Sequence, residues 1–183
     1  NSLPNSPIIY IRHSQYDSDQ DEINVRGTLG EVYEFISIPE QTWFHVSLNL
    51  NRTSDGDILT YYLDGVEVFD TTIDDLGVLD FTDCSLPESG VYLGTAPQVD
   101  WDDFNGQIDD LQIWDKSNNS TEIINYMHCS PTGDEDGLIG YWNFEEGPNE
   151  GEVLDISLNG NNGVITNATY SEEIPEQNCA TSI

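Results

Sequence analysis

The chain has 183 residues, and its 35 Asp and Glu against four Lys and Arg give a formal net charge of −31 at pH 7. Most of such a surface would repel nucleic acid and anionic membranes, so nucleic-acid binding is excluded and membrane insertion is not expected. Cations that screen or bind a compact chain of this charge would stabilise it, which makes calcium the first cofactor to consider.

Strand patterns begin early and recur at short intervals. Residues 8–13 (IIYIRH), 31–38 (EVYEFISI) and 43–50 (WFHVSLNL) are rich in β-branched and aromatic residues. In the third run apolar and polar residues alternate, as in a strand with one buried face. Turn-forming residues separate the runs, and this rhythm predicts an antiparallel sandwich or barrel.

The firmest local prediction is a hairpin in residues 57–70 (DILTYYLDGVEVFD). Two β-rich runs flank Asp64-Gly65, a dipeptide that adopts the positive φ angles of a two-residue turn. A short helix is expected over residues 120–127, where Ser and Thr can cap and Glu122 suits the positive end of the helix dipole. Further strands are expected at residues 90–94, 107–114, 138–144 and about 163–169.

Three acidic segments lie between these elements: 17–22 (DSDQDE), 99–103 (VDWDD) and 133–137 (GDEDG). A solvated loop is the simplest interpretation of each. Asp17, Asp19 and Asp21 nevertheless present three carboxylates at alternating positions, and carboxylate oxygens suit calcium. Glu22 stands where an EF-hand loop requires Gly, so a calcium site here would be of another kind.

The chain has three cysteines, which are too few and too unevenly spaced for a zinc site or a disulfide framework. Cys129 and Cys179 flank the stretch 137–163, so a disulfide between them would close a loop around it and anchor the C-terminal segment. Reduced structural thiols are the alternative. Cys84 would then be the unpaired cysteine, and we expect it to be buried.

No pair of residues is arranged for catalysis. A retaining glycosidase needs two carboxylates roughly 5–5.5 Å apart across the scissile bond. Glu145 and Glu146 are adjacent, so in a strand they would point to opposite faces, and they are expected in the turn before Gly147. His45 and the other histidines accompany no nucleophile motif such as Gly-x-Ser-x-Gly, and His45 is expected to pack against a neighbouring strand. We predict no catalytic residues and no enzymatic activity.

Asp109 and Asp110 interrupt the alternation of the strand expected at 107–114. Strict alternation would place Asp109 on the face of Leu111 and Ile113. Either a bulge resets the register, or one Asp points inward and accepts hydrogen bonds from loop amides. We favour this structural role, with metal binding as the alternative.

The order of these short patterns resembles the laminin G-like, concanavalin A-like family over about residues 30–127. The matching patterns are Trp43-Phe44-His45-Val46-Ser47, Tyr62-Leu63-Asp64-Gly65-Val66, Leu93-Gly94, residues 104–114 (FNGQIDDLQIW) and Glu122-Ile123. Pentraxins share the late pattern of strand, Gly, Ile, Trp and short helix. The resemblance implies an all-β fold, a two-sheet antiparallel jelly-roll β-sandwich with one short helix.

A second resemblance covers Cys129 through Pro131-Thr132-Gly133 to Pro175 and Cys179, which are similar to a segment that follows such domains in secreted Bacteroidetes proteins. It implies a laminin G-like sandwich at 1–128 and a C-terminal returning segment at 129–183 packed on it. The first strands usual in the family are missing before Asn1. A sandwich without them would expose a strand edge, which residues 137–165 are expected to cover.

A sugar site needs an aromatic platform beside polar groups, and Trp101 between Asp100 and Asp102 is the candidate. Trp101 folded back as a lid on the core is the alternative. Pentraxins carry a calcium cluster after the position of Leu93-Gly94, and here only Asp100, with Asp102 and Asp103, could supply ligands.

The resemblance implies a non-catalytic carbohydrate-binding or adhesion module of an exported, bacterial cell-surface protein, with calcium as a candidate cofactor. Its expected partners are a glycan or cell-surface molecule and neighbouring modules of a larger protein. The alternative is a purely structural module that assembles with its neighbours by strand complementation. A glycosidase is the third hypothesis, because this fold serves many functions.

Overall fold

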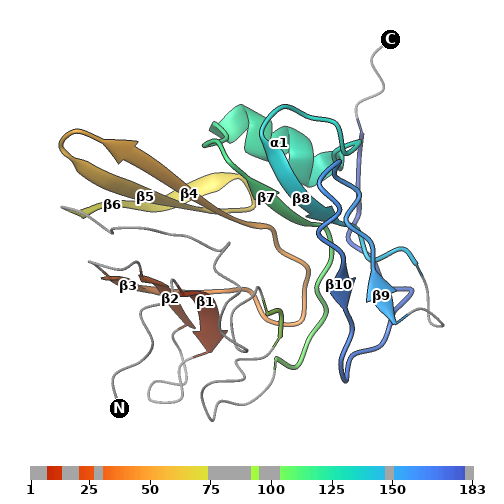
Figure 1. The fold of residues 1–183 in the computed structure, drawn as a ribbon. Coiled ribbons are helices and arrows are strands. Elements are labelled where there is room, and N and C mark those ends of the chain that lie inside the picture. Colours follow the sequence, from red (N-terminus) through yellow and green to blue (C-terminus); the bar gives the residue numbers. More distant parts are fainter. Residues whose placement is uncertain are drawn as a thin grey trace, which may run out of the picture. The chain divides into compact units, whose positions relative to one another are not determined.

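The computed structural model describes residues 8–13, 21–26, 31–73, 92–94, 104–146 and 151–179. Within them the sheets whose register is established are antiparallel and the one helix is short, which confirms the predicted fold class (Figure 1). Helix α1 has nine residues, far from the length of about 20 that spans a bilayer, and no helix of the described residues could cross a membrane.

By its contacts the chain divides into two compact units. The first contains Asn1–Thr42, Leu50–Thr60 and Asp70–Asn105, and the second contains Trp43–Asn49, Tyr61–Phe69 and Gly106–Ile183. The second unit thus joins the segment after Cys129 with the strand and helix that precede it. The predicted division between residues 128 and 129 stays a prediction.

The first unit contains a three-stranded sheet of order β1-β2-β3. The strands are β1 (Ile8–His13), β2 (Asp21–Arg26) and β3 (Glu31–Ile36). Ile23, Asn24 and Val25 are 0%, 2% and 1% exposed, so both faces of the central strand are covered. Strand β2 was not predicted, because its sequence DEINVR is half charged and its start falls in an expected acidic loop.

A second sheet has the order β4-β5-β6, with β4 (Val46–Thr53), β5 (Gly56–Leu63) and β6 (Val66–Ile73). The predicted hairpin is confirmed: Asp64 and Gly65 have φ angles of 49° and 73°, the positive values that a type I′ turn requires. The Asp64 N–H donates to the His45 carbonyl, and the Asp64 Oδ1 accepts from the His45 N–H. These two bonds fix the turn against the residue before β4.

The second unit is built on β7 (Leu111–Trp114), β8 (Leu138–Trp142) and α1 (Ser120–His128). Strands β7 and β8 pair with Gln112 opposite Tyr141. The helix begins with a capping box. Asn119 Oδ1 accepts the backbone N–H groups of Thr121 and Glu122, and Glu122 Oε2 accepts the Asn119 N–H. The expectation that Ser or Thr caps the helix is therefore wrong, because Asn119 lies one residue earlier. Trp114 packs on Tyr126 at 4.7 Å between ring centroids, which joins the helix to β7.

The remaining strands are two-residue pieces, β9 (Glu152–Val153) and β10 (Gly163–Val164), which pair with each other. Strand β10 is shorter than the predicted 163–169, and β9 was not predicted. Residues 92–94 of the strand expected at 90–94 are not in a strand, and residues 90–91 lie outside the described ranges.

A substitution at Gly65 tests the close contact between the β5–β6 hairpin and helix α1. A Cβ at this position would lie 2.5 Å from the Ile124 Cγ1 of α1, at a φ of 73°. Gly65→Ala should therefore lower the free energy of unfolding by about 1–3 kcal/mol, in part from the positive φ and in part from overlap with Ile124. Urea denaturation measures the loss.

The matched control is the same substitution in an Ile124→Ala background. Without the isoleucine the overlap disappears, so Gly65→Ala should cost only about 1 kcal/mol. An equal cost in both backgrounds would contradict the close approach.

Candidate functional site

Most of the predicted ligand and metal residues cannot be placed. Asp17, Asp19, Asp100, Trp101, Asp102 and Asp103 lie outside the described ranges, and their roles stay predictions. Asp21 begins β2, and its Oδ2 accepts the Ile38 N–H at 2.8 Å. Within the described ranges, no group of three or more His, Cys, Asp or Glu side chains is placed to hold a metal ion.

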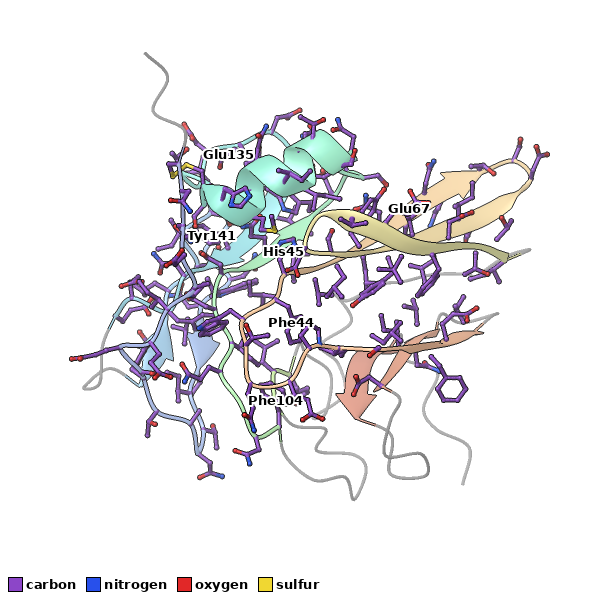
Figure 2. The ribbon with its side chains drawn as sticks, turned by 180° about the vertical axis from the view of Figure 1, so that it is seen from behind. Phe44, His45, Glu67, Phe104, Glu135 and Tyr141 are labelled. Carbon is purple, nitrogen blue, oxygen red and sulfur yellow. A yellow bond between two sulfur atoms is a disulfide. The ribbon has the colours of Figure 1, made fainter. Side chains whose placement is uncertain are left out.

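The predicted disulfide is present. Cys129 and Cys179 are bonded across 50 residues of sequence, and Figure 2 shows the bond in yellow beside the end of α1. The bond fixes the C-terminal segment to the residue that follows the helix. Cys84 lies outside the described ranges.

Asp110 adopts a φ of 51° immediately before β7. The strand predicted at 107–114 therefore begins only at Leu111, because the left-handed residue breaks the alternation. The Asp110 N–H donates to Asp109 Oδ1 at 3.0 Å, a local side-chain-to-backbone bond before the strand. Asp110 thus has the structural role that we favoured.

The donors to Asp110 differ from those expected. The donors given for its carboxylate are side chains: the Tyr141 hydroxyl at 2.6 Å, the Ser130 hydroxyl at 3.0 Å and the Gln177 side-chain amide. These donors come from β8, from the residue after Cys129 and from the C-terminal segment. One carboxylate therefore gathers three segments that are far apart in the sequence.

A cavity of about 270 Å³ opens around this carboxylate. All of its lining residues belong to the second unit. They are Asp109, Asp110, Ser130, Tyr141, Asn143, Glu145, Ile174, Pro175 and Gln177. The lining combines three carboxylates and uncharged hydrogen-bonding groups with one small apolar side, formed by Ile174 and Pro175.

The carboxylates of the cavity influence one another. Burial and then the charge of Asp110 raise the pKa of Asp109 to about 6, with Glu145 adding to the effect and the Asp110 N–H opposing it. Asp109 therefore gains a proton as the pH falls through about 6, and the cavity loses negative charge. Burial and the hydrogen bond to Asp110 raise the pKa of Tyr141, so Tyr141 remains a hydroxyl donor.

The two adjacent glutamates have separate environments, as expected for residues beyond the end of the strand. Glu145 lines the cavity. Glu146 accepts the Leu154 N–H at 2.7 Å and the Tyr170 hydroxyl at 3.1 Å, so it holds the returning chain in place. The pair does not act as one site.

His45 is half-buried, and its Nδ1 has no hydrogen-bond partner among the described residues. Burial lowers the pKa of His45, against the opposing charges of Asp64 and Asp110. The imidazole is therefore neutral near pH 7. A half-buried, neutral imidazole agrees with the packing role expected for His45.

Asp155 fixes the segment that follows the cavity wall. It is 9% exposed. Its Oδ1 accepts the N–H groups of Tyr141 at 3.0 Å and Ser157 at 2.9 Å, and its Oδ2 accepts the Asn161 N–H at 2.7 Å. The Ile156 N–H returns a bond to the Tyr141 carbonyl. The Asn- and Gly-rich turn after residue 155 is therefore a structural clamp on β8.

Trp142 strengthens the same clamp, because its indole Nε1–H donates to the Asn161 carbonyl at 2.9 Å. The indole lies over Gly140, where a Cβ would approach Trp142 Cη2 to 2.4 Å. A glycine is required there for lack of space. Tyr141 and Trp142 thus pack in the second unit, and Tyr141 also contributes its hydroxyl to the cavity.

The acidic segment 133–137 forms an ordered turn. Glu135 accepts the backbone N–H groups of Thr132 at 2.7 Å and Gly133 at 2.9 Å. Burial alone would raise the pKa of Glu135, but these hydrogen bonds outweigh it and lower the pKa. At least this acidic residue is a structural acceptor rather than a solvated charge.

Ser130, Asn143 and Gln177 line the cavity but were not predicted as site residues from the sequence. One signal was available: Ser130 follows Cys129, and Gln177 lies two residues before Cys179, so a disulfide would bring both to one place. Asn143 carried no such signal, because it depends on where β8 ends.

Asp155 provides a test of the clamp. Asp155→Asn keeps the side-chain shape but replaces one acceptor with an amide donor, so the N–H groups it serves lose a partner. We expect the free energy of unfolding at pH 7 to fall by about 1–3 kcal/mol in urea denaturation. Asp136→Asn, the same change at an exposed position, should have little effect.

The loss should depend on pH. Burial opposes ionisation of Asp155, but its hydrogen bonds from Tyr141, Asn161 and Ser157 outweigh burial and lower its pKa. The ionised carboxylate therefore stabilises the chain above its unfolded-state pKa of about 4, and this contribution is lost as the pH falls through the lower folded-state pKa. The difference between wild type and Asp155→Asn should shrink below about pH 4. A difference that stays constant would contradict the role of the charge.

Comparison with solved structures identifies related folds. A crystal structure of a candidate carbohydrate-binding protein from Bacteroides ovatus ATCC 8483 aligns with 93% of this chain at a TM-score of 0.65 and 18% identity. An S-layer domain-containing protein from Clostridium thermocellum ATCC 27405 aligns with 68% of the chain at a TM-score of 0.37 and 19% identity. The chain spans 50% of the first protein and 64% of the second. Only the first likeness bears on the fold, because the TM-score of the second is below 0.5.

A search of curated proteins gives no significant match. A laminin G-type family model, described as the concanavalin A-like lectin/glucanases superfamily, matches residues 6–124, which is more than half of the chain. The antiparallel strands and the short helix agree with that match. The chain therefore belongs to the concanavalin A-like lectin/glucanases superfamily and has its β-sandwich class of fold.

Proposed function

We propose that the chain is a non-catalytic carbohydrate-binding module and that the cavity around Asp109, Asn143 and Glu145 binds part of a glycan. The observation that carries this proposal is the cavity lining, which places hydrogen-bonding side chains beside a small apolar side in a member of a lectin and glucanase superfamily. The Bacteroides ovatus protein, described as a candidate carbohydrate-binding protein, supports it by analogy of fold.

The lining suits the two kinds of surface that a sugar presents. Sugar hydroxyls both donate and accept hydrogen bonds, so the Glu145 carboxylate can accept and the Asn143 amide can do both. The C–H face of a pyranose is apolar and can pack on Ile174, which is 61% exposed, and on Pro175. A mainly polar site with one apolar side is the chemistry expected for a saccharide.

The context of the module also belongs to this proposal. We place it in a secreted or cell-surface bacterial protein, where a glycan or a surface molecule is the partner and neighbouring modules continue the chain. Trp101 with Asp100 and Asp102 would add a second contact surface. Calcium would bind the acidic loops that contain Asp17, Asp19, Asp21 and Asp103, which the charge of −31 favours.

One observation favours glycoside hydrolysis as a second candidate. Asp109, with a pKa of about 6, shares the cavity with Glu145. Glycosidases use one carboxyl group with a raised pKa as general acid and a second, ionised carboxylate as nucleophile or base. The test must therefore detect both binding and cleavage.

A glycan array separates the hypotheses. The full chain is applied with calcium and, separately, with a chelator at matched ionic strength. We expect binding to a polysaccharide or oligosaccharide class, and a chelator-sensitive signal would support calcium as cofactor. An empty array in both conditions would contradict carbohydrate binding and favour the structural module that assembles by strand complementation.

Substitutions of cavity residues test whether the glycan binds in the cavity. Asn143→Ala and Glu145→Ala should each weaken binding to the glycan found on the array by roughly tenfold, or about 1.4 kcal/mol, because each removes hydrogen bonds to sugar hydroxyls. Glu172→Ala, an exposed carboxylate outside the cavity, should bind as wild type does. Unchanged affinity in both cavity variants would place the site elsewhere. Release of reducing ends that Asp109→Asn abolishes would contradict the non-catalytic assignment.

A further inference from the structure

The C-terminal residues 174–179, here called the strap, form one side of the cavity. Ile174, Pro175 and Gln177 line it, and Cys179 ends the strap at the disulfide with Cys129. No helix or strand includes residues 165–179, so no β-ladder holds the strap in place. It is positioned by side-chain contacts and by one covalent bond.

The main side-chain contact is made by Gln177. Its amide donates to the Asp110 carboxylate and, at 2.7 Å, to the Ser130 hydroxyl. The Asp110 carboxylate also accepts hydrogen bonds from Tyr141 and Ser130, so Gln177 is its third donor.

These contacts are weak without the disulfide. Gln177 is exposed, as is the bond from Gln107 Nε2 to Glu173 Oε2 just before the strap. Hydrogen bonds open to water contribute little to stability, because water replaces either partner. Cys129 and Cys179 are both exposed, and exposed disulfides are the more readily reduced ones. The covalent bond is therefore both the principal restraint on the strap and an accessible one.

We propose that the strap forms one wall of the cavity only while the Cys129–Cys179 bond is intact, and that reduction by a dithiol releases this wall and opens the cavity further. The dithiol supplies two electrons and two protons: the S–S bond of the chain breaks, Cys129 and Cys179 become thiols, and the dithiol closes to its own disulfide. Opening removes Ile174, Pro175 and Gln177 from the cavity lining. The effect of opening on glycan binding rests on the proposed function, whereas the opening itself does not.

Asp109 reports on the opening, because its carboxyl group lies in the cavity and burial is the largest cause of its raised pKa. The other titrating groups that act on it, Asp110 and Glu145, keep their positions in the chain when the strap leaves. Carbon-detected NMR of the side-chain carboxyl group gives its midpoint in the full chain. With the disulfide intact we expect about 6, and with dithiothreitol a fall of roughly one unit or more toward the ordinary value near 4.

Three variants accompany the titration. Cys129→Ser with Cys179→Ser should reproduce the reduced midpoint without reductant. Gln177→Ala with the disulfide intact should give a smaller fall, because the tether remains while the amide is lost. Glu172→Gln, outside the strap, should leave the midpoint unchanged. The Trp142 indole N–H resonance, bonded to Asn161, serves as the folding control.

The same Asp109 midpoint in oxidised and reduced protein would overturn the proposal. Loss of the Trp142 resonance on reduction would also overturn it, because the whole unit would then unfold rather than the strap alone. Repeating the glycan array in dithiothreitol separates the two proposals. Because the strap carries Ile174 and Pro175, the apolar side of the proposed sugar site, a signal that falls at least tenfold supports both proposals, and a signal that reduction leaves unchanged or raises contradicts the strap. An Asp109 shift with no glycan signal in either state supports the strap and contradicts carbohydrate binding.

Discussion

The hydrogen bond from the Tyr141 hydroxyl to Asp110, at 2.6 Å, is the interaction on which the site depends. Tyr141 is 3% exposed, and its backbone N–H is bound by Asp155, so the ring is fixed from two sides. Asp110 then has a fixed position from which it binds Ser130 and Gln177. A buried hydroxyl and a part-buried carboxylate satisfy each other, and the cavity forms around them.

Several of the acidic residues act as structural hydrogen-bond acceptors, a role that the net charge alone does not indicate. Asp110, Glu135, Glu146 and Asp155 each accept hydrogen bonds from backbone or side-chain donors of other segments or of their own turn. A fold with short strands leaves many N–H groups outside ladders, and carboxylates serve them. The returning segment is held mainly in this way, with the disulfide adding a covalent restraint.

Local sequence rules predicted the features that depend on a few neighbouring residues. Asp64-Gly65 predicted the turn, and the runs at 8–13 and 31–38 predicted β1 and all of β3, the second with two residues too many. Local sequence rules failed where contacts between residues far apart in the sequence determine the structure. Strand β2 is polar in sequence yet buried, the start of β7 depends on the left-handed Asp110, and the cavity needs the disulfide to bring Ser130 and Gln177 together. The family resemblance supplied the fold class, and the family match confirms it.

The Tyr141–Asp110 bond is central to the second unit. A double-mutant cycle measures its contribution to stability directly. Tyr141→Phe, Asp110→Ala and the double variant are compared by urea denaturation at pH 7. We predict a coupling energy of about 1–3 kcal/mol, because either single change leaves the other group without its partner. Additive losses, with a coupling energy near zero, would contradict the account.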